Sequence, residues 1–193
     1  MQIADTAERV RDLLKGINLY LIGMMGSGKT TVGRELAAKI GYGFCDTDAV
    51  IEKVAGKSIN DIFNSDGEEG FRELEGKVLG ELAAFTRLAI ATGGGIVLRR
   101  ENWSYLQQGL VVWLDVPVEI LLSRLGGDTT RPLLQVSDRE AELKTRLEQR
   151  KRLYAQADLH ITVTDEKETP EEIAARIIET IPSVLKPPIN PEN

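Results

Sequence analysis

An alternation of short apolar runs with longer amphipathic segments constrains the fold of this chain most. Five runs of five or six residues occur, most of them rich in Val, Ile or Leu and without polar residues at alternate positions. Strands buried on both faces have this pattern, as in a parallel sheet covered by helices. The order of segments predicts one α/β domain with right-handed crossovers. The expected strands are 18–23, 43–48, 88–92, 110–115 and 159–164, and the expected helices are 29–40, 49–65, 67–85, 100–107, 117–125, 137–157 and 170–184.

Length, charge and cysteine content limit the class of protein. The 193 residues suffice for one well-packed domain. A net charge of −6 disfavours a general nucleic-acid binder, which needs a basic face. The single cysteine, Cys45, is compatible with a reducing compartment. No apolar run approaches the length of about 18 residues that crosses a bilayer, and the first residues lack the apolar core of a secretory signal. We therefore expect a cytoplasmic protein with no membrane or nucleic-acid partner.

The two ends of the chain carry no functional motif. Ile3, Ala7, Val10 and the Leu13–Leu14 pair fit one face of a short helix, which we expect to pack on the domain. The last eight residues, KPPINPEN, contain three prolines and are expected to form a loose tail.

The stretch GMMGSGKT at Gly23–Thr30 fits the phosphate-binding pattern G-x-x-x-x-G-K-[ST]. An expected strand precedes it and an expected helix follows, which is the context that the pattern requires. Backbone N–H groups of this loop would point at phosphate oxygens, Lys29 would reach the β- and γ-phosphates, and the Thr30 hydroxyl would bind Mg²⁺. The alternative is a glycine-rich turn with a solvent-facing lysine. A GTPase is disfavoured because the chain has no N-K-x-D segment.

Two carboxylates, Asp46 and Asp48, stand at the end of the second expected strand. Residues i and i+2 of a strand point to the same side, so both side chains are expected to face one cleft. One carboxylate would hold the metal through its waters, and the other would orient and deprotonate an acceptor hydroxyl. The alternative is a strand that turns into a helix capped by an aspartate.

Three arginines are candidates for binding anionic groups. Arg72 lies among glutamates and Arg150 lies beside Lys151 and Arg152, so a salt-bridged or solvated helix surface would also explain either one. Arg131 stands in the stretch GGDTTRPLL, which has the hinges and the charge of a closing lid. An exposed turn with an idle arginine is the alternative for this segment.

Three further features have more than one explanation. The triple glycine Gly93–Gly95 follows the third expected strand, where open α/β sheets bind ligands, although a bare turn would also fit. Asp115 ends an apolar strand like an ordinary magnesium ligand, yet Asp115-Val116-Pro117 also fits a helix start. His160 lies in an expected strand, and core packing is its expected role.

Taken together, six segments resemble the shikimate kinases, a P-loop family similar to the nucleoside-monophosphate kinases. The segments are GMMGSGKTT, FCDTD, IFNSDGEEGFRELE, TGGGIV, GGDTTRPLL and RKRLYAQAD, and the resemblance covers about residues 17–182. It implies a single kinase domain with a five-stranded parallel sheet in the order 2-3-1-4-5, flanked by helices. It also implies a helical substrate-binding region at about 48–76, a lid at about 124–136 and a loose tail at 186–193. The resemblance places the metal on Asp46 rather than on Asp115.

The resemblance implies a Mg²⁺-dependent transfer of the γ-phosphate of ATP to shikimate. Its implied catalytic residues are Lys29, Asp48 and Arg131. Its implied ATP-binding residues are Gly26, Ser27, Gly28, Lys29, Thr30, Thr31, Arg131 and, at the adenine, Arg124 and Lys167. Its implied shikimate-binding residues are Asp48, Arg72, Gly93, Gly94, Gly95 and Arg150, and its metal residues are Thr30, directly, and Asp46, through water.

Two other functions remain as alternatives. Another small-molecule kinase, such as a gluconate kinase or a nucleoside-monophosphate kinase, is disfavoured by the order of D-x-D, F-R, GGG and R-P-L-L. A non-catalytic binding or regulatory relative is disfavoured because all the charged site residues are present. We expect the protein to act as a monomer.

Overall fold

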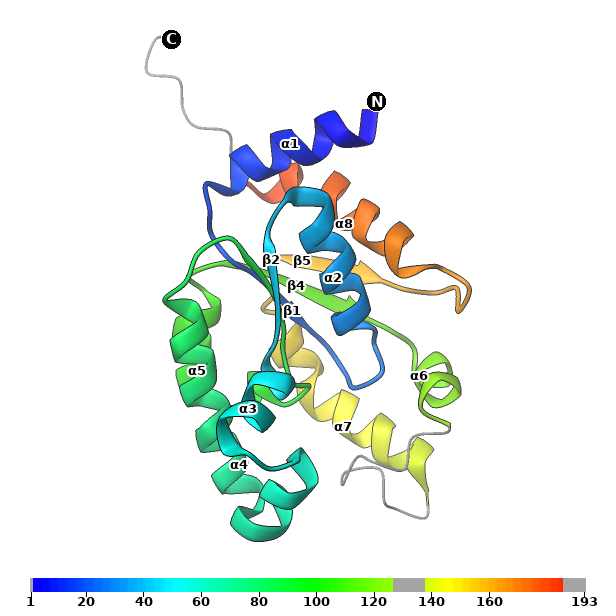
Figure 1. Cartoon of the computed structure of the whole chain (residues 1–193). Coiled ribbons are helices and arrows are strands. Elements are labelled where there is room, and N and C mark those ends of the chain that lie inside the picture. The colour runs from blue at the N-terminus through cyan, green and yellow to red at the C-terminus, as the bar shows by residue number, and fades with distance from the viewer. Residues whose placement is uncertain (1, 127–137, 186–193) are drawn as a thin grey trace.

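A five-stranded sheet forms the centre of the molecule (Figure 1). The computed structural model describes residues 2–126 and 138–185. All neighbouring strands run parallel in the order β2-β3-β1-β4-β5, which confirms the predicted sheet. In the register, Leu19 pairs with Ala89 on one side and with Leu110 on the other. The strands are β1 (Leu19–Ile22), β2 (Gly43–Asp46), β3 (Leu88–Ala91), β4 (Leu110–Asp115) and β5 (Leu159–Thr162).

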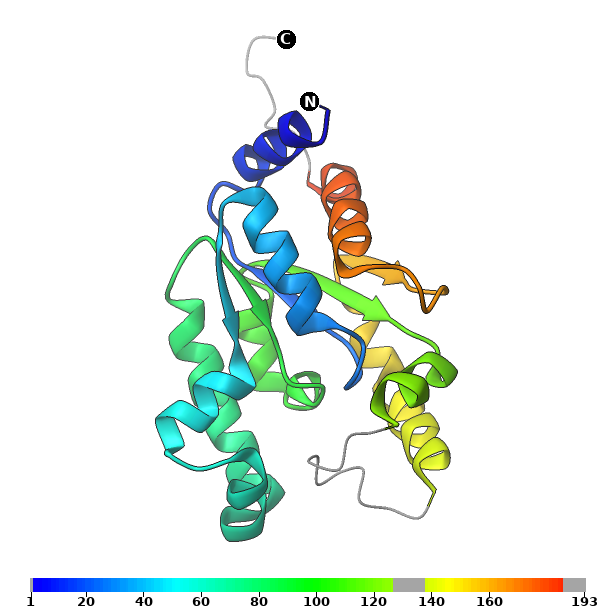
Figure 2. The ribbon, with the colours of Figure 1, turned by 45° about the vertical axis from the view of Figure 1, so that its right-hand side comes forward.

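Helices cover both faces of this sheet. On one face α2 and α8 lie side by side, and α1 rests against both (Figures 1 and 2). On the other side α4 packs with α5, and α7 packs against the short helix η1. The helices are α1 (Gln2–Leu14), α2 (Lys29–Ile40), α3 (Thr47–Ala55), α4 (Ile59–Ala83), η1 (Ile96–Leu98), α5 (Arg100–Leu106), α6 (Val118–Leu125), α7 (Arg139–Tyr154) and α8 (Pro170–Val184).

Burial of the strands follows their place in the sheet. Every residue of the central strand β1 is buried, whereas the edge strand β5 buries only alternate residues. The expectation that His160 packs in the core is therefore wrong, because it faces outward from this edge strand. Its ring stacks on Trp113, with ring centroids 4.1 Å apart, and its Nε2 lies 2.8 Å from an oxygen of Asp115.

The expected helix 49–65 is two helices. Helix α3 ends at Ala55, and Gly56 follows in a left-handed conformation with φ 63°. Helix α4 then begins after Ser58, whose side chain accepts a hydrogen bond from the N–H of Asp61 at 3.1 Å. The boundary between the expected helices 49–65 and 67–85 is a kink within α4, where Gly67 has φ 71° and ψ −178°. Left-handed glycine and a serine cap are ordinary helix-ending and helix-starting signals, so the sequence did contain this break.

Helices α3 and α4 share a small core of their own. Its buried members are Ile51, Ile62, Phe71 and Val78, separate from the main core of the sheet. The side chain next to Phe71 along α4 is that of Arg72. This second core therefore holds the arginine-bearing turn of α4 in place beside the sheet.

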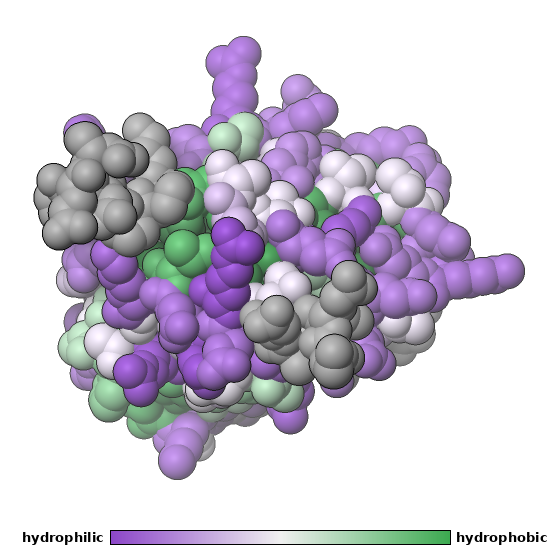
Figure 3. Space-filling view, turned by 90° about the horizontal axis from the view of Figure 1, so that it is seen from above, coloured by the Kyte–Doolittle hydropathy of each residue, from purple (hydrophilic) through white to green (hydrophobic). Residues whose placement is uncertain are grey.

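The end of the molecule that carries α1 presents mostly hydrophilic residues when it is viewed from above, with smaller hydrophobic areas between them (Figure 3). Beneath this surface, Ala7, Val10 and Leu14 are buried, as the amphipathic pattern predicts. Within the described ranges, no helix has the length and apolar character needed to cross a membrane.

Leu14→Ala is expected to lower the free energy of unfolding by about 2–4 kcal/mol, because it removes a fully buried side chain from the contact of α1 with the domain. Urea unfolding followed by circular dichroism measures the change. The control is Arg9→Ala, an exposed position of the same helix, for which we expect a change within about 0.5 kcal/mol. Equal, small losses in both variants would contradict the packing of α1.

Candidate active site

The loop between β1 and α2 is built to surround an anion. Gly28 has φ 92° and directly precedes α2, which has no side-chain cap at its start. The N-terminus of a helix favours a negatively charged ligand. The Nζ of Lys29 donates to the carbonyls of Gly23 at 2.9 Å and Met24 at 2.8 Å. A cavity of about 230 Å³ lies over this loop, and its lining includes Gly26, Gly28, Lys29, Thr30, Thr31 and Asp46.

A hydroxyl and a carboxylate meet at the edge of this cavity. The Oγ1 of Thr30 donates to Oδ2 of Asp46 at 2.6 Å. Magnesium commonly takes one or two protein oxygens and completes its shell with phosphate oxygens and waters. Thr30 and Asp46 fit that pattern, and residues 2–126 and 138–185 contain no cluster of three or more His, Cys, Asp or Glu that could hold a metal. Asp115, the competing candidate, is paired with His160.

Asp46 and Asp48 do not both lie on a strand, so the i, i+2 argument for them is wrong. Asp46 is the last residue of β2 and also caps α3, with its Oδ1 accepting from the N–H of Asp48 at 3.0 Å and of Ala49 at 3.4 Å. Asp48 lies in the first turn of α3. The helix-cap alternative therefore describes the local structure, yet both carboxylates do line one cleft, the cavity over the phosphate loop, as expected.

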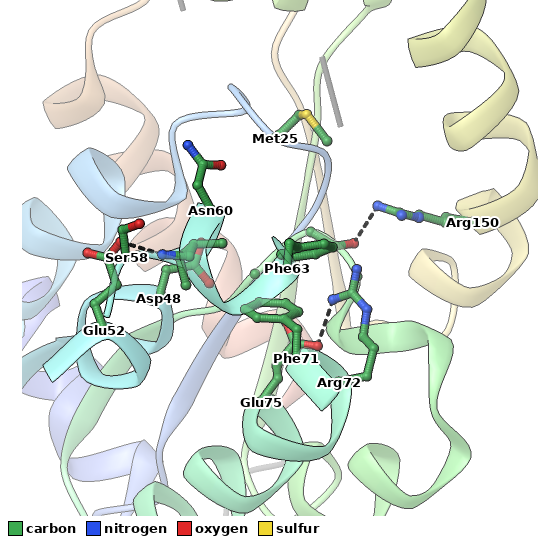
Figure 4. A pocket seen from close by; sticks show the side chains of 14 residues that line it. Met25, Asp48, Glu52, Ser58, Asn60, Phe63, Phe71, Arg72, Glu75 and Arg150 are labelled. Atoms are coloured by element: carbon green, nitrogen blue, oxygen red, sulfur yellow. Dashed lines mark hydrogen bonds and ion pairs between the residues drawn. The ribbon is translucent and has the colours of Figure 1, made fainter. Parts of the chain in front are cut away.

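A second cavity, of about 440 Å³, is shown in Figure 4. It adjoins the first, because Met25, Asp48, Gly93 and Gly94 line both. Arg72 and Arg150 come to it from α4 and α7, and Asp48 lies on another side. Phe63 and Phe71 give it apolar walls. Arg72 is 6% exposed and Arg150 is 3% exposed, so neither belongs to a solvated helix surface. Glu52 and Glu75 also line the cavity, and Glu75 is paired with Arg72. Two buried guanidinium groups on one side and the Asp48 carboxylate on another suit a ligand with an acid at one end and hydroxyls at the other.

Each of these arginines is oriented by a neighbouring oxygen. The guanidinium of Arg72 donates to Oε2 of Glu75 at 2.7 Å and to Oε1 of Glu68 at 3.3 Å. Arg150 donates to the carbonyl of Gly94 at 3.1 Å, and the hydroxyl of Tyr154 donates to the same carbonyl at 2.6 Å. These bonds restrict the guanidinium groups to the positions from which they reach the cavity.

Glu75 and Tyr154 are site residues that the sequence analysis missed. Glu75 is fully buried, and burial raises the pKa of its carboxyl while the charge of Arg72 opposes that shift. Its only sequence signal is the i, i+3 spacing to Arg72, which many exposed helical pairs also have. Tyr154 gives no signal of its own, because its contact with Gly94 joins segments that are distant in the chain.

Neighbouring side chains of the protein leave no room for a Cβ at two of the three glycines. A Cβ on Gly95 would lie 2.3–2.4 Å from guanidinium atoms of Arg72. A Cβ on Gly93 would lie 2.5 Å from Oε1 of Glu75 and 3.0 Å from Oδ1 of Asp48. A Cβ on Gly94 would come no closer than 3.4 Å to any protein atom. All three glycines line the larger cavity, so a substrate remains the expected neighbour of Gly94.

Three further residues were expected to bind ATP, and their surroundings differ. An NH1 of Arg124 in α6 lies 3.4 Å from the carbonyl of Gly26 and 3.3 Å from that of Ser27, so this arginine reaches the phosphate loop. Lys167 is exposed in the turn between β5 and α8. Arg131, and the expected lid from residue 127 onward, lie outside the described residues.

Comparison with known proteins identifies close relatives. A family model described as shikimate kinase matches residues 25–182. The shikimate kinase of Nostoc punctiforme is 66% identical over 175 residues, covering 91% of this chain and 96% of that protein. A solved shikimate kinase from Acinetobacter baumannii in complex with shikimate has a TM-score of 0.84 and 41% identity, over 90% of this chain and 97% of that one. The enzyme from Bacteroides thetaiotaomicron has a TM-score of 0.78 and 33% identity, over 86% and 98%.

Proposed function

Because the chain belongs to the shikimate kinase family, we propose that it transfers the γ-phosphate of ATP to the 3-hydroxyl of shikimate, giving shikimate 3-phosphate and ADP. The product leads to chorismate and the aromatic amino acids. One observation of the site supports this substrate most: Arg72, Arg150 and Asp48 line a single cavity that adjoins the phosphate loop. Shikimate has one carboxylate and three hydroxyls, which this set of side chains matches.

In this proposal the two arginines bind the acid end of shikimate. Both are buried, so water screens their charges poorly. Glu75 and Glu68 balance part of the charge of Arg72, whereas Arg150 donates to a neutral carbonyl. Contacts from two guanidinium groups to one carboxylate fix its position and its plane. The ring then extends along the backbone of Gly93–Gly95, and its hydroxyls face Asp48.

Asp48 is assigned to the accepting hydroxyl. The proton of that hydroxyl moves to an Asp48 oxygen as the hydroxyl oxygen forms its bond to phosphorus and the bond to the ADP oxygen breaks. Phosphoryl transfer asks the protein mainly for positioning and charge neutralisation. Asp48 meets the first need because the cap from Asp46 fixes the turn of α3 that carries it.

The phosphate loop is assigned to ATP. N–H groups at the start of α2 and the ammonium of Lys29 would bind phosphate oxygens, with Thr31 beside them in the cavity lining. Thr30 and Asp46 would hold Mg²⁺, which when bound neutralises charge that develops on the phosphates. We assign Arg124 and Lys167 to the adenine end and Arg131 to the γ-phosphate. We also propose that the enzyme works as a monomer in the cytoplasm, where ATP is available, since one chain supplies both cavities.

A turnover screen tests the substrate. ADP release is measured with ATP and Mg²⁺ in the presence of shikimate, gluconate or AMP. We expect turnover with shikimate, at a rate well above that with the other two acceptors. Phosphorylation of gluconate alone would overturn the proposal, and so would binding of shikimate without any turnover.

Arg150→Lys is expected to raise the KM for shikimate about 10- to 100-fold and to leave the KM for ATP within about twofold. Lysine keeps the charge but loses the planar pair of donors that suits a carboxylate. Steady-state kinetics with each substrate varied in turn measure both constants. The matched control is Arg152→Lys, an exposed position of the same helix, which should behave as the wild type. An unchanged KM for shikimate in Arg150→Lys would remove Arg150 from the site.

A further inference from the structure

Thr47 lies between the two aspartates and joins the two sides of the site. It is the first residue of α3, and its side chain is fully buried. Its Oγ1 accepts a hydrogen bond from the N–H of Gly93 at 3.0 Å. This bond connects the start of the helix that carries Asp48 with the start of the glycine segment.

This hydrogen bond lies just beyond the last paired residues of β2 and β3. Strands β2 and β3 pair as far as Asp46 and Ala91, and both strands end there. Beyond that point the chain from β2 becomes α3, while the chain from β3 continues into the triple glycine. The Thr47 hydroxyl thus extends the link between the two strands into the region that borders both cavities.

We propose that Thr47 is a positioning residue for phosphoryl transfer, fixing Asp48 relative to the glycine segment on which Arg72 rests. The inference depends on the proposed function, because it concerns the acceptor of the same reaction. The proposed function assigns no contact with substrate or metal to Thr47, so this role is a separate one.

The close packing around Gly93 makes this position sensitive. A Cβ at Gly93 would lie 2.5 Å from Oε1 of Glu75 and 3.0 Å from Oδ1 of Asp48, so the backbone there lies directly against both carboxylates. A shift of this backbone changes the distance from Asp48 to the wall of the acceptor cavity. It also moves Gly95, against which the guanidinium of Arg72 lies. Misplacement of reacting groups by about 1 Å can cost about 100-fold in rate.

Thr47→Val removes the acceptor and keeps the shape of the side chain. The buried N–H of Gly93 then loses its partner, and an unsatisfied buried donor is costly enough to make the segment move. Thr47→Ser keeps the hydroxyl and is the rescue variant. If the valine variant does not fold, Thr47→Ala removes the same acceptor without placing a methyl group against Gly93, and it carries the same expectation.

A matched control lies one residue before Gly93. Thr92 is also buried, and its Oγ1 donates to the carbonyl of Leu21 at 2.8 Å. That carbonyl also accepts from the N–H of Thr92 at 3.2 Å. Thr92→Val therefore removes a hydroxyl from the same region while leaving the backbone groups of both residues paired. Thr92 lines the phosphate-loop cavity but not the larger one, so the KM for shikimate is the constant to compare.

The experiment compares Thr47→Val, Thr47→Ser, Thr92→Val and the wild type by steady-state kinetics and thermal unfolding. We expect Thr47→Val to lower kcat/KM for shikimate about 10- to 100-fold, with a raised KM for shikimate and a KM for ATP within about twofold. Thr47→Ser should stay within about threefold of the wild type in every constant, and Thr92→Val should keep its KM for shikimate within about threefold. A role in stability alone would lower the melting temperature and the active fraction without raising the KM for shikimate.

Three results would overturn the inference: a normal kcat/KM in Thr47→Val, a serine variant as defective as the valine variant, or an equal rise in the KM for shikimate in Thr92→Val. Failure of the proposed function would look different, because the wild type itself would not phosphorylate shikimate. In that case the same four proteins, assayed with the acceptor that the wild type does use, still decide the role of Thr47.

Discussion

Asp48→Asn is expected to lower kcat for shikimate about 1,000-fold while the Kd for ATP stays within about twofold of the wild-type value. Asparagine has the same shape and still accepts a hydrogen bond, so it can orient the acceptor hydroxyl, but it cannot take the proton. Loss of a positioned proton acceptor typically costs about 100- to 10,000-fold in rate. Quenched-flow or coupled-assay kinetics give kcat, and titration calorimetry gives the two ligand affinities.

The control for this change is Asp66→Asn, an exposed aspartate of α4 that lines neither cavity. It should have wild-type kinetics. A near-normal kcat in Asp48→Asn would show that Asp48 only orients the hydroxyl and that the proton leaves by another route. A loss of ATP binding equal to the loss of turnover would instead show that Asp48 acts through the phosphate loop, which it also borders.

Gly95→Ala is expected to lower kcat/KM for shikimate about 100-fold or more, with little change in the KM for ATP. The backbone of Gly95, at φ −97° and ψ 3°, lies in a region that alanine can adopt. The new Cβ would lie 2.3–2.4 Å from the guanidinium of Arg72, so that group must leave its position. The protein should still fold, because the end of a long side chain can move, but Glu75 would lose the partner of its buried carboxylate.

A double-mutant cycle tests this route directly. If Gly95→Ala acts by displacing Arg72, then the double variant Gly95→Ala/Arg72→Ala should have a kcat/KM within about threefold of that of Arg72→Ala alone. Residues that share one contact are expected to be non-additive in this way, whereas independent sites add. Full additivity of the two changes would contradict the explanation. Gly94→Ala, whose Cβ would meet protein atoms only at ordinary contact distances of 3.4 Å or more, should raise the KM for shikimate through contact with the substrate itself.

The sequence predicted the architecture well because local periodicity and local signals carry it. The apolar runs give the strands, and the glycine-lysine loop stands where strand and helix meet. The prediction was weaker where an edge is involved. A strand with one neighbour exposes alternate residues, and the apolar–polar alternation LHITVT at 159–164 is the signal for such a strand, which the expectation for His160 did not use.

The candidate site could be predicted as a set of charged residues but not as an arrangement. Asp48 was placed on a strand because the signal for an aspartate cap and the signal for a strand end are the same residues. Glu75 and Thr47 could not be recognised, because their importance comes from the segments that they touch: a guanidinium in one case and a backbone N–H in the other. The roles of Arg131 and Lys167 stay predictions. That of Arg131 rests on the stretch GGDTTRPLL and on the resemblance, and that of Lys167 rests on the resemblance alone.

The two cavities are not separated by a layer of protein, because Met25, Asp48, Gly93 and Gly94 line both of them. A compound that joins a carboxylated ring to a phosphate mimic would therefore need only a short, rigid bridge to occupy both at once. Because the second group then binds within the same molecule, its contribution grows with its effective concentration rather than with its own affinity. The open connection between the cavities makes this chain a target for bisubstrate inhibitors. Their selectivity over other ATP-dependent kinases would come from the half that contacts Arg72 and Arg150.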